Sequence, residues 1–198
     1  MNSAGEPLRL GAVVLTGGTG TRLGGLDKSA IEVDGVTLLE RALAAVGAAV
    51  EVVVVGPPVP TTRPVTWTVE DPPRGGPAAG LLAGLDRFAT PPELVAVLAV
   101  DMPRAHAGTV ARLTWAVEGD PLADGAVLLD ADGRRQTLAA VYRHAALERV
   151  RPGVGEANGL SMRRLVEGLH LAEVPAVGDE ARDVDTWTDL RDLGGSGF

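Results

Sequence analysis

The first half of the chain contains three runs of nearly uninterrupted aliphatic residues, each bounded by turn-forming residues. These runs span residues 11–16, 50–55 and 94–100. A parallel strand shows this pattern because helices cover both faces of its sheet, whereas a strand with one solvated face alternates apolar and polar residues. We therefore predict that the three runs form the centre of a parallel sheet.

The segments between these predicted strands have helical periodicity. Residues 77–88 form one predicted helix, and residues 36–46 form another, whose apolar stripe consists of Leu38, Leu39, Ala42, Leu43 and Val46. Alternation of strand and helix indicates βαβ units with right-handed crossovers. A short extended segment at 65–69 precedes the helix at 77–88 and is predicted to add an edge strand.

The second half of the chain predicts a change from parallel to antiparallel pairing. After a helix at 108–117, the segments 126–129 and 137–142 flank the turn-forming sequence Asp-Ala-Asp-Gly, as in a hairpin. The remaining predicted elements are a short helix, a strand and a terminal helix, at 161–169, 171–175 and 186–193. We therefore expect an α/β fold, a three-layer αβα arrangement around a mixed, mostly parallel sheet.

Composition limits the number of domains and the class of partner. The 198 residues, 45% of them apolar, suffice for a single domain over 1–198, in which we expect 1–10 to be a flexible N-terminus. A formal net charge of −8 argues against nucleic-acid binding and against a basic membrane-binding surface. Without a long apolar run or a secretory leader pattern, we expect a cytoplasmic protein with no membrane contact.

The residue types also limit the metal chemistry. The chain contains no cysteine, which excludes disulfides, thiolate metal sites and a cysteine nucleophile. Its three histidines, His106, His144 and His170, are too widely spaced for a zinc motif. Any bound metal ion is therefore expected to have oxygen ligands.

Lys28 is the single lysine among 18 basic residues, and the other 17 are arginine. In a chain whose Ala-, Gly-, Pro- and Arg-rich composition favours arginine, a retained lysine indicates a position that needs a compact point charge. The alternative interpretation is a solvated loop lysine that was retained by chance.

A glycine-rich segment, LTGGTGTRLGGLDK at 15–28, directly follows the first predicted strand and contains the cations Arg22 and Lys28. Backbone N–H groups at the carboxyl end of a central strand can bind phosphate, and the cations supply positive charge. The segment lacks the contiguous Gly-Lys-Ser/Thr of a P-loop, and its G-x-G-x-x-x-G spacing differs from a dinucleotide fingerprint. We predict a phosphate-binding loop of another kind, with a flexible surface loop as the alternative.

Carboxylates occur at the ends of several predicted elements. Asp101 follows the third aliphatic strand, at the edge where open α/β sheets bind ligands, so it is a candidate Mg²⁺ ligand, with a turn-capping role as the alternative. Asp183 and Asp185 precede the terminal helix, where a ligand role competes with an N-cap role for Asp185 or Thr186. Asp71 lies in a second glycine-rich turn, ahead of the helix at 77–88.

These landmarks together resemble the MobA-type molybdenum cofactor guanylyltransferases, a family with the nucleotide-diphospho-sugar transferase fold. The segment at 15–28 is similar to the family signature L-x-G-G-x-x-x-R-x-G followed by a lysine. The other similarities are Asp71 followed by GGPAAG, VDMP at 100–103, QTLAAVY at 136–142 and DVDTWTDL at 183–190. The resemblance extends over nearly the whole chain, from 12 to 190.

The resemblance implies a nucleotidyltransferase that moves GMP from GTP to the phosphate of molybdopterin and releases pyrophosphate, without a protein nucleophile. It implies Mg²⁺ as cofactor, GTP and molybdopterin or its molybdenum form as substrates, and transient contact with other proteins of molybdenum cofactor biosynthesis. The implied catalytic residues are Arg22, Lys28 and Asp101, and the implied metal ligands are Asp101 and Asp185. The implied nucleotide-binding residues are Leu15, Thr16, Gly17, Gly18, Lys28, Asp71 and Asp101.

The chain departs from the family pattern near the expected base and metal positions. Thr16 replaces an alanine, and the asparagine that the family often has just after the second strand is missing where this chain has Val55-Gly56-Pro57. Asp183 and Asp185 replace asparagines, as in cytidylyltransferase relatives. CTP and other acceptors therefore remain alternatives, as does a non-catalytic nucleotide-binding protein. The candidates for binding the acceptor phosphate are Arg134, Arg135, Arg163 and Arg164.

Overall fold

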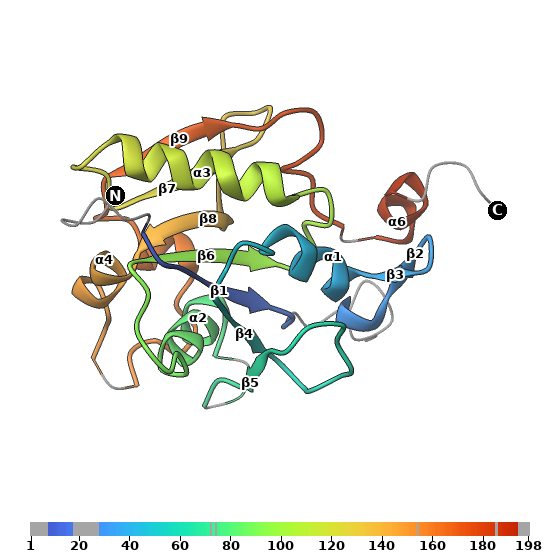
Figure 1. The fold of residues 1–198 in the computed structure, drawn as a ribbon, viewed down its shortest axis with the longest axis horizontal. Coiled ribbons are helices and arrows are strands. Elements are labelled where there is room, and N and C mark those ends of the chain that lie inside the picture. Colours follow the sequence, from blue (N-terminus) through green and yellow to red (C-terminus); the bar gives the residue numbers. More distant parts are fainter. Residues whose placement is uncertain are drawn as a thin grey trace.

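The computed structural model describes residues 8–17, 28–71, 73, 75–153, 155–184 and 186–193. A seven-stranded sheet with the order β5-β4-β1-β6-β8-β7-β9 runs through the molecule (Figure 1). The strands are β1 (Leu10–Leu15), β4 (Glu51–Val55), β5 (Thr66–Thr68), β6 (Leu94–Ala99), β7 (Gly125–Leu129), β8 (Arg135–Arg143) and β9 (Leu171–Pro175). Of these seven strands, β8 alone is antiparallel to its neighbours, which confirms the predicted mixed, mostly parallel sheet.

The three aliphatic runs form β1, β4 and β6, as their composition predicts. Val13 of β1 pairs with Val53 of β4 on one side and with Val97 of β6 on the other, and all three side chains are inaccessible to solvent or nearly so. The predicted edge strand is β5, the predicted hairpin is β7 and β8, and the predicted strand at 171–175 is β9.

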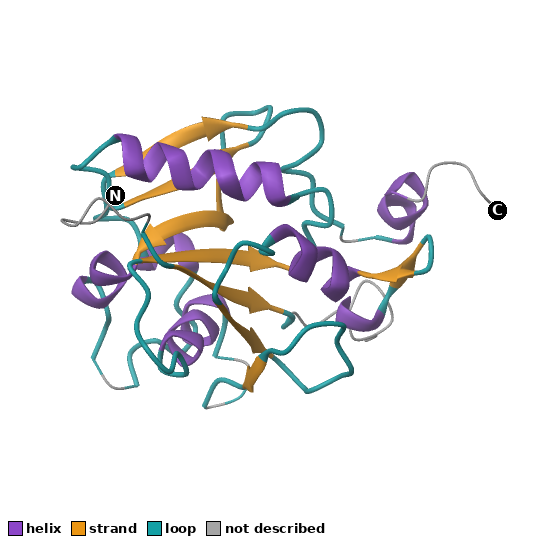
Figure 2. Ribbon diagram, in the orientation of Figure 1, coloured by secondary structure: helices purple, strands orange, loops and turns teal. Residues whose placement is uncertain are grey.

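Helices cover both faces of the sheet, so the three-layer arrangement is confirmed (Figure 2). Ala12 and Val14 of β1 pack toward α1 and α3, whereas Val13 and Leu15 pack toward α2, α4 and α5. This division follows from the alternation of side chains along a strand. The helices are α1 (Leu38–Ala45), α2 (Pro77–Leu85), α3 (Ala107–Gly119), α4 (His144–Arg149), α5 (Met162–Leu165) and α6 (Trp187–Leu193).

The predicted helix at 36–46 begins later than expected. Val36–Thr37 forms β3, which pairs with β2 (Glu32–Val33) in a separate two-stranded sheet. The turn between them contains Asp34 and Gly35, both with positive φ, at 55° and 73°. The Thr37 hydroxyl accepts a hydrogen bond from the backbone N–H of Glu40, so a cap starts α1 where the hairpin ends.

Two other boundaries differ from the prediction. The predicted helix at 161–169 ends at Leu165, and α4 was not predicted at all. Of the expected flexible segment 1–10, the residues from Leu8 onward belong to the fold. Leu10 is the first residue of β1, and the carbonyl of Arg9 accepts a hydrogen bond from the N–H of Leu94.

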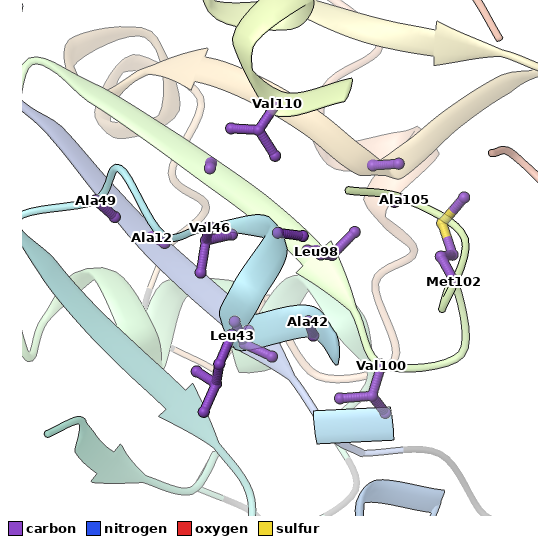
Figure 3. Packing of buried hydrophobic residues seen from close by; sticks show 14 of the residues in the cluster. Ala12, Ala42, Leu43, Val46, Ala49, Leu98, Val100, Met102, Ala105 and Val110 are labelled. Carbon is purple, nitrogen blue, oxygen red and sulfur yellow. The ribbon is translucent and has the colours of Figure 1, made fainter. Parts of the chain in front are cut away.

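The turn after β6 contributes side chains to the same buried cluster as α1 and α3 (Figure 3). Val100 and Met102, on either side of Asp101, are 2% and 4% exposed, and Ala105 is also buried. The N–H of Val100 donates to the carbonyl of Leu15, which extends the β1–β6 ladder by one bond. Asp101 therefore occupies a rigid position at the end of the sheet.

The parallel strands end at a common edge. Figure 1 shows the arrowheads of β1, β4 and β6 pointing toward the side that holds the β2–β3 hairpin and α6. Ligands of open α/β sheets bind outside the carboxyl ends of the strands, so the site is expected at this edge. Among the residues that the structure describes, every helix is too short or too polar to traverse a lipid bilayer.

Candidate functional site

Three chain segments that are distant in the sequence meet at the carboxyl edge of the sheet. The Nζ of Lys28 lies 3.3 Å from Oδ2 of Asp101 and donates a hydrogen bond of 3.1 Å to the carbonyl of Val184. The N–H of Val184 in turn donates to the backbone carbonyl of Asp101 at 2.7 Å. The structure thus brings the chain after β1, the turn after β6 and the segment before α6 to one point.

Lys28 begins a short 3-10 helix, η2 (Lys28–Ala30), and its side chain is only 9% exposed. Burying an ammonium group without compensation costs several kcal/mol, so the position requires oxygen partners such as Asp101 and Val184. The burial contradicts the alternative interpretation of Lys28 as a solvated loop lysine. A compact, three-donor ammonium group suits contacts with oxygens from two different segments.

Asp101 presents its carboxylate toward solvent from a fixed backbone. Its side chain is 33% exposed, and the buried neighbours on both sides restrict the backbone. Because one oxygen is paired with Lys28, the site combines a cation and a carboxylate within one hydrogen-bond length. This pair can bind a phosphate and a divalent cation side by side, since the lysine complements the anion and the aspartate complements the metal.

The segment before α6 lies next to Asp101, which a ligand role for this segment requires. Thr186 and Asp189 form the reciprocal hydrogen bonds of a capping box, in which the N–H of Asp189 donates to the Thr186 hydroxyl and the N–H of Thr186 donates to the Asp189 carboxylate. The capping role therefore belongs to Thr186. Asp183 is exposed beside Val184. The predictions for Gly18, Arg22 and Asp185 lie outside the described residues.

The three residues predicted to contact the base, Leu15, Thr16 and Gly17, differ in how accessible they are in the structure. Thr16 is 4% exposed, and its hydroxyl and its N–H both donate to the carbonyl of Val55, at 2.9 and 3.1 Å. Its side chain is therefore directed into the sheet. The carbonyl of Leu15 is already bonded to the N–H of Val100, whereas Gly17 is exposed. Gly17 is thus the described residue of this group whose backbone is most accessible to a base.

Gly56 and Thr16 occupy adjacent positions where β4 and β1 end. A Cβ atom added at Gly56 would lie 1.8 Å from Oγ1 of Thr16, and the Gly56 φ of +151° is itself unfavourable for a residue with a side chain. An asparagine at this position is therefore incompatible with the observed backbone and with Thr16. Gly56 and Thr16 are therefore sterically coupled, because the pairing of Leu15 with Val55 brings them side by side.

The structure places Asp71 and the four candidate arginines without assigning them a partner among the described residues of the site. Asp71 is exposed in the loop between β5 and α2, so its nucleotide contact stays a prediction. Arg135 and Arg164 form surface ion pairs with Glu173 and Glu167, and Arg134 lies 3.8 Å from Asp132. Arg163 is exposed on α5. The observed ion pairs agree with ordinary surface charge, and a role in binding the acceptor phosphate stays a prediction.

Sequence reasoning missed a buried carboxylate close to this region. Glu180, between β9 and α6, is 3% exposed and accepts hydrogen bonds from Arg112, from the Thr109 hydroxyl and from the N–H of Val177. Burial by itself raises the pKa of the Glu180 carboxyl, but these hydrogen bonds and the charge of Arg112 outweigh it and lower the pKa to about 2. Its partners on α3 are distant in the sequence, so no local motif marks it.

The residues present can contribute to a Mg²⁺ site but do not complete one. Within the described ranges, no three acidic or histidine side chains converge on one point. Mg²⁺ commonly takes one or two carboxylates and completes its coordination with substrate phosphates and water. The partly exposed carboxylate of Asp101 fits that partial role, and Asp185 stays the predicted second ligand.

Comparison with known proteins identifies the class of this fold as that of the NTP transferases. Residues 12–174 match the family model described as the MobA-like NTP transferase domain, and the chain belongs to this family. It is 37% identical over 161 residues to the molybdenum cofactor guanylyltransferase of Acidiphilium cryptum, covering 77% of this chain and 76% of that protein. It is 36% identical over 139 residues to the enzyme of the same name from Cupriavidus necator, covering 63% of this chain and 65% of the relative.

Solved structures support the same fold. Molybdopterin-guanine dinucleotide biosynthesis protein A from Archaeoglobus fulgidus superimposes with a TM-score of 0.71 at 19% identity, over 92% of this chain and 96% of that one. The 2-C-methyl-D-erythritol 4-phosphate cytidylyltransferase from Thermus thermophilus gives a TM-score of 0.69 at 21% identity, over 94% and 98% of the two chains. At these identities the structural likeness establishes the architecture alone.

Proposed function

We propose that this chain transfers GMP from GTP to the terminal phosphate of molybdopterin, forming molybdopterin guanine dinucleotide and pyrophosphate. The observation that carries the proposal is the meeting of Lys28 and Asp101 at the carboxyl edge of a MobA-like sheet. Relatives that carry the name molybdenum cofactor guanylyltransferase support the choice of substrates. Because GTP is an intracellular nucleotide, we place the reaction in the cytoplasm.

In the proposed reaction, an oxygen of the molybdopterin phosphate attacks the α-phosphorus of GTP. A bond forms between that oxygen and the α-phosphorus, the bond between the α-phosphorus and the β-phosphate oxygen breaks, and pyrophosphate leaves. No covalent bond to the protein forms, which suits a chain without cysteine. The protein's task is to position the reactants and to stabilise the negative charge that develops at phosphorus.

Lys28 is proposed to bind the triphosphate next to the reacting phosphorus. Its ammonium group is held by the Asp101 carboxylate and the Val184 carbonyl, so it offers a fixed cation rather than a mobile surface charge. Arg22 is predicted to contribute a second cation from the glycine-rich loop. Backbone N–H groups after β1, including that of Gly17, are predicted to contact the nucleotide.

Asp101 is proposed to hold Mg²⁺ together with Asp185. When bound, Mg²⁺ supplies charge neutralisation and orientation of the phosphate oxygens. The contribution of the protein is a carboxylate on a rigid turn between two buried residues, Val100 and Met102. Because Asp101 lies next to Lys28, a metal ion held by Asp101 would contact the same phosphate chain as the lysine ammonium group.

Cytidylyl transfer is the second candidate, because the base side of the site departs from the guanylyltransferase pattern. The asparagine contact expected just after the second strand is missing where the chain has Val55-Gly56-Pro57, and a side chain at Gly56 would clash with Thr16. The transfer of GMP remains our proposal because the relatives named above are guanylyltransferases.

An assay that compares GTP with CTP tests the proposal. Pyrophosphate release is measured with Mg²⁺, molybdopterin and either GTP or CTP, and the melting temperature is measured with each nucleotide alone. We expect GTP to support release and to raise the melting temperature more than CTP, because only a bound ligand stabilises the fold. Release with CTP alone would assign the chain to cytidylyl transfer, and protection without release would leave a binding protein.

A further inference from the structure

Glu180 binds the beginning of α3 from the loop that follows β9. Its carboxylate accepts hydrogen bonds from the Thr109 hydroxyl at 2.8 Å and from both terminal nitrogens of Arg112. The Nε2 of His106, the N-cap residue of α3, lies 3.0 Å from the same carboxylate. The N–H of Val177 donates to it at 2.9 Å, so one carboxylate joins two separate segments.

These two segments are the ones that carry the site. The residues bound by Glu180 on α3 follow the Asp101 turn, and Glu180 itself precedes Val184 by four positions. Val184 is 3% exposed and bonds through its N–H to Asp101 and through its carbonyl to Lys28. The carboxylate therefore holds the segment at 177–184 against the same stretch of chain that presents Asp101.

Two partly exposed arginines add polar contacts around this attachment. Arg104 lies 3.7 Å from the Asp179 carboxylate and donates a hydrogen bond of 3.0 Å to the carbonyl of Asp192 in α6. Arg182 binds the Asp192 carboxylate at 2.9 Å. Exposed ion pairs contribute little individually, so the buried Glu180 is the principal polar link.

A buried carboxylate is a costly way to hold two segments together, and an apolar contact of similar shape would often be at least as stable. Its advantage is directional, because hydrogen bonds to fixed donors set the relative position of two segments more narrowly than apolar packing does. At a phosphoryl-transfer site such precision affects rate, since small displacements of positioning groups reduce turnover strongly.

We propose that Glu180 is a positioning residue of the nucleotidyltransferase site, acting through Val184 on the relative placement of Lys28 and Asp101. The inference rests on the proposed function for its effect on turnover, whereas its effect on the Val184 hydrogen bond is independent of any substrate. Glu180 is proposed to act on the site through Val184, without touching the reacting atoms.

The test compares Glu180→Gln with a control at the opposite edge of the sheet. The glutamine keeps the shape of the side chain and removes its charge. Asp124→Asn is the matched control, because Asp124 also binds an arginine and a backbone N–H, those of Arg149 at 2.7 Å and of His170 at 3.0 Å. It lies just before β7, at the amino edge of the parallel strands, away from Asp101.

The first readout is amide hydrogen exchange at Val184, followed by NMR. We expect Glu180→Gln to accelerate this exchange about tenfold or more, with exchange at Val13 and Val97 in β1 and β6 changed less than about twofold. Asp124→Asn should leave the Val184 amide unchanged. If Glu180→Gln is poorly folded, Arg112→Met removes the charged donor to Glu180 with the same expected direction. Equal acceleration by the control, or none by Glu180→Gln and Arg112→Met, would overturn the positioning role.

The second readout is steady-state turnover of the full chain. Glu180→Gln should lower kcat about tenfold while changing KM for GTP less than about threefold, because the nucleotide still binds but its phosphates are less well aligned. Asp124→Asn should retain kcat. An unchanged kcat in Glu180→Gln would contradict the inference, whereas a wild-type chain without GTP turnover would contradict the proposed function and leave the exchange result standing.

Discussion

The Nζ of Lys28 and Oδ2 of Asp101 lie 3.3 Å apart although the two residues are 73 positions apart in the sequence. The pair forms where β1 and β6 end, and the backbone of Val184 closes it from a third segment. A single buried lysine in a chain that otherwise uses arginine thus faces the carboxylate that we propose as a metal ligand.

Replacing Lys28 by arginine is expected to impair turnover more than folding. The side chain is 9% exposed between two oxygen partners, at 3.1 and 3.3 Å, and a planar guanidinium is too wide to occupy the same place. We expect kcat/KM for GTP to fall about 100-fold, equivalent to about 2.7 kcal/mol of transition-state stabilisation. Overpacking should lower the unfolding free energy by about 1–3 kcal/mol.

The control for Lys28→Arg is the reverse exchange at an exposed position, Arg149→Lys, where the arginine pairs with Asp124 on the surface. This variant should retain the turnover and the stability of the wild type. Near-normal kcat/KM in Lys28→Arg would mean that the point charge of lysine is not required.

Asp101→Asn is expected to abolish turnover and its dependence on Mg²⁺ concentration. It should also destabilise the fold by about 1–3 kcal/mol, because it leaves the buried Lys28 ammonium without its carboxylate. Stability and activity can be separated with the double variant Lys28→Met/Asp101→Asn, which removes both charges. The double variant should regain stability in urea unfolding and remain inactive. Activity in the refolded single variant would exclude Asp101 as a metal ligand.

Gly56→Ala is expected to be strongly destabilising, by about 2–4 kcal/mol, because its Cβ would lie 1.8 Å from the Thr16 hydroxyl and its φ is +151°. Thr16→Ala alone should cost about 1 kcal/mol through loss of the hydrogen bond to Val55. In the double variant the clash is relieved but the backbone strain persists, so we expect partial recovery. Additive losses in chemical denaturation would show that the two positions are not coupled.

Glu180 is expected to contribute to stability in a pH-dependent way. Hydrogen bonds from Arg112, Thr109 and Val177 hold its pKa at about 2, below the ordinary value of 4.5, even though burial opposes this. A lowered pKa in the folded state means that the contribution is complete above about pH 4.5 and disappears as the pH falls through 2. The difference between the folded-state pKa and the ordinary pKa corresponds to at most about 3 kcal/mol of unfolding free energy.

The measurement is the unfolding free energy of the wild type and Glu180→Gln in urea at pH 6, 4, 3 and 2. Other carboxylates titrate in both proteins, so the difference between the two isolates Glu180. We expect this difference to shrink as the pH falls. A difference that stays constant from pH 6 to pH 2 would show that the carboxylate is not stabilised by its partners.

The sequence predicted the central sheet well because buried parallel strands have a continuous aliphatic pattern that few other elements share. The sequence predicted short elements less well, because each of them depends on only a few residues. The β2–β3 hairpin depends on the turn at Asp34 and Gly35, and Val36 belongs to that hairpin although it adjoins the apolar stripe of α1. Helix α4, with six residues, is too short to show a helical period.

For the site, side chains with specific chemistry could be predicted and backbone contacts could not. Lys28 was identified by its rarity and Asp101 by its place after a strand, and the structure brings them together. Val184 contributes through its N–H and carbonyl, which every residue except proline possesses, so its identity gives no signal. Glu180 and Thr109 are 71 positions apart, and only the folded chain shows that they are in contact.

Guanylyl transfer is tested by following the two ends of GTP separately. The chain is incubated with Mg²⁺, molybdopterin and GTP labelled with ³²P at either the α- or the γ-phosphate. Our account predicts that the α label appears in molybdopterin guanine dinucleotide and the γ label in pyrophosphate, with both signals lost in Asp101→Asn. Release of the γ label as inorganic phosphate, or α label that stays out of the molybdopterin product while CTP label enters it, would contradict guanylyl transfer.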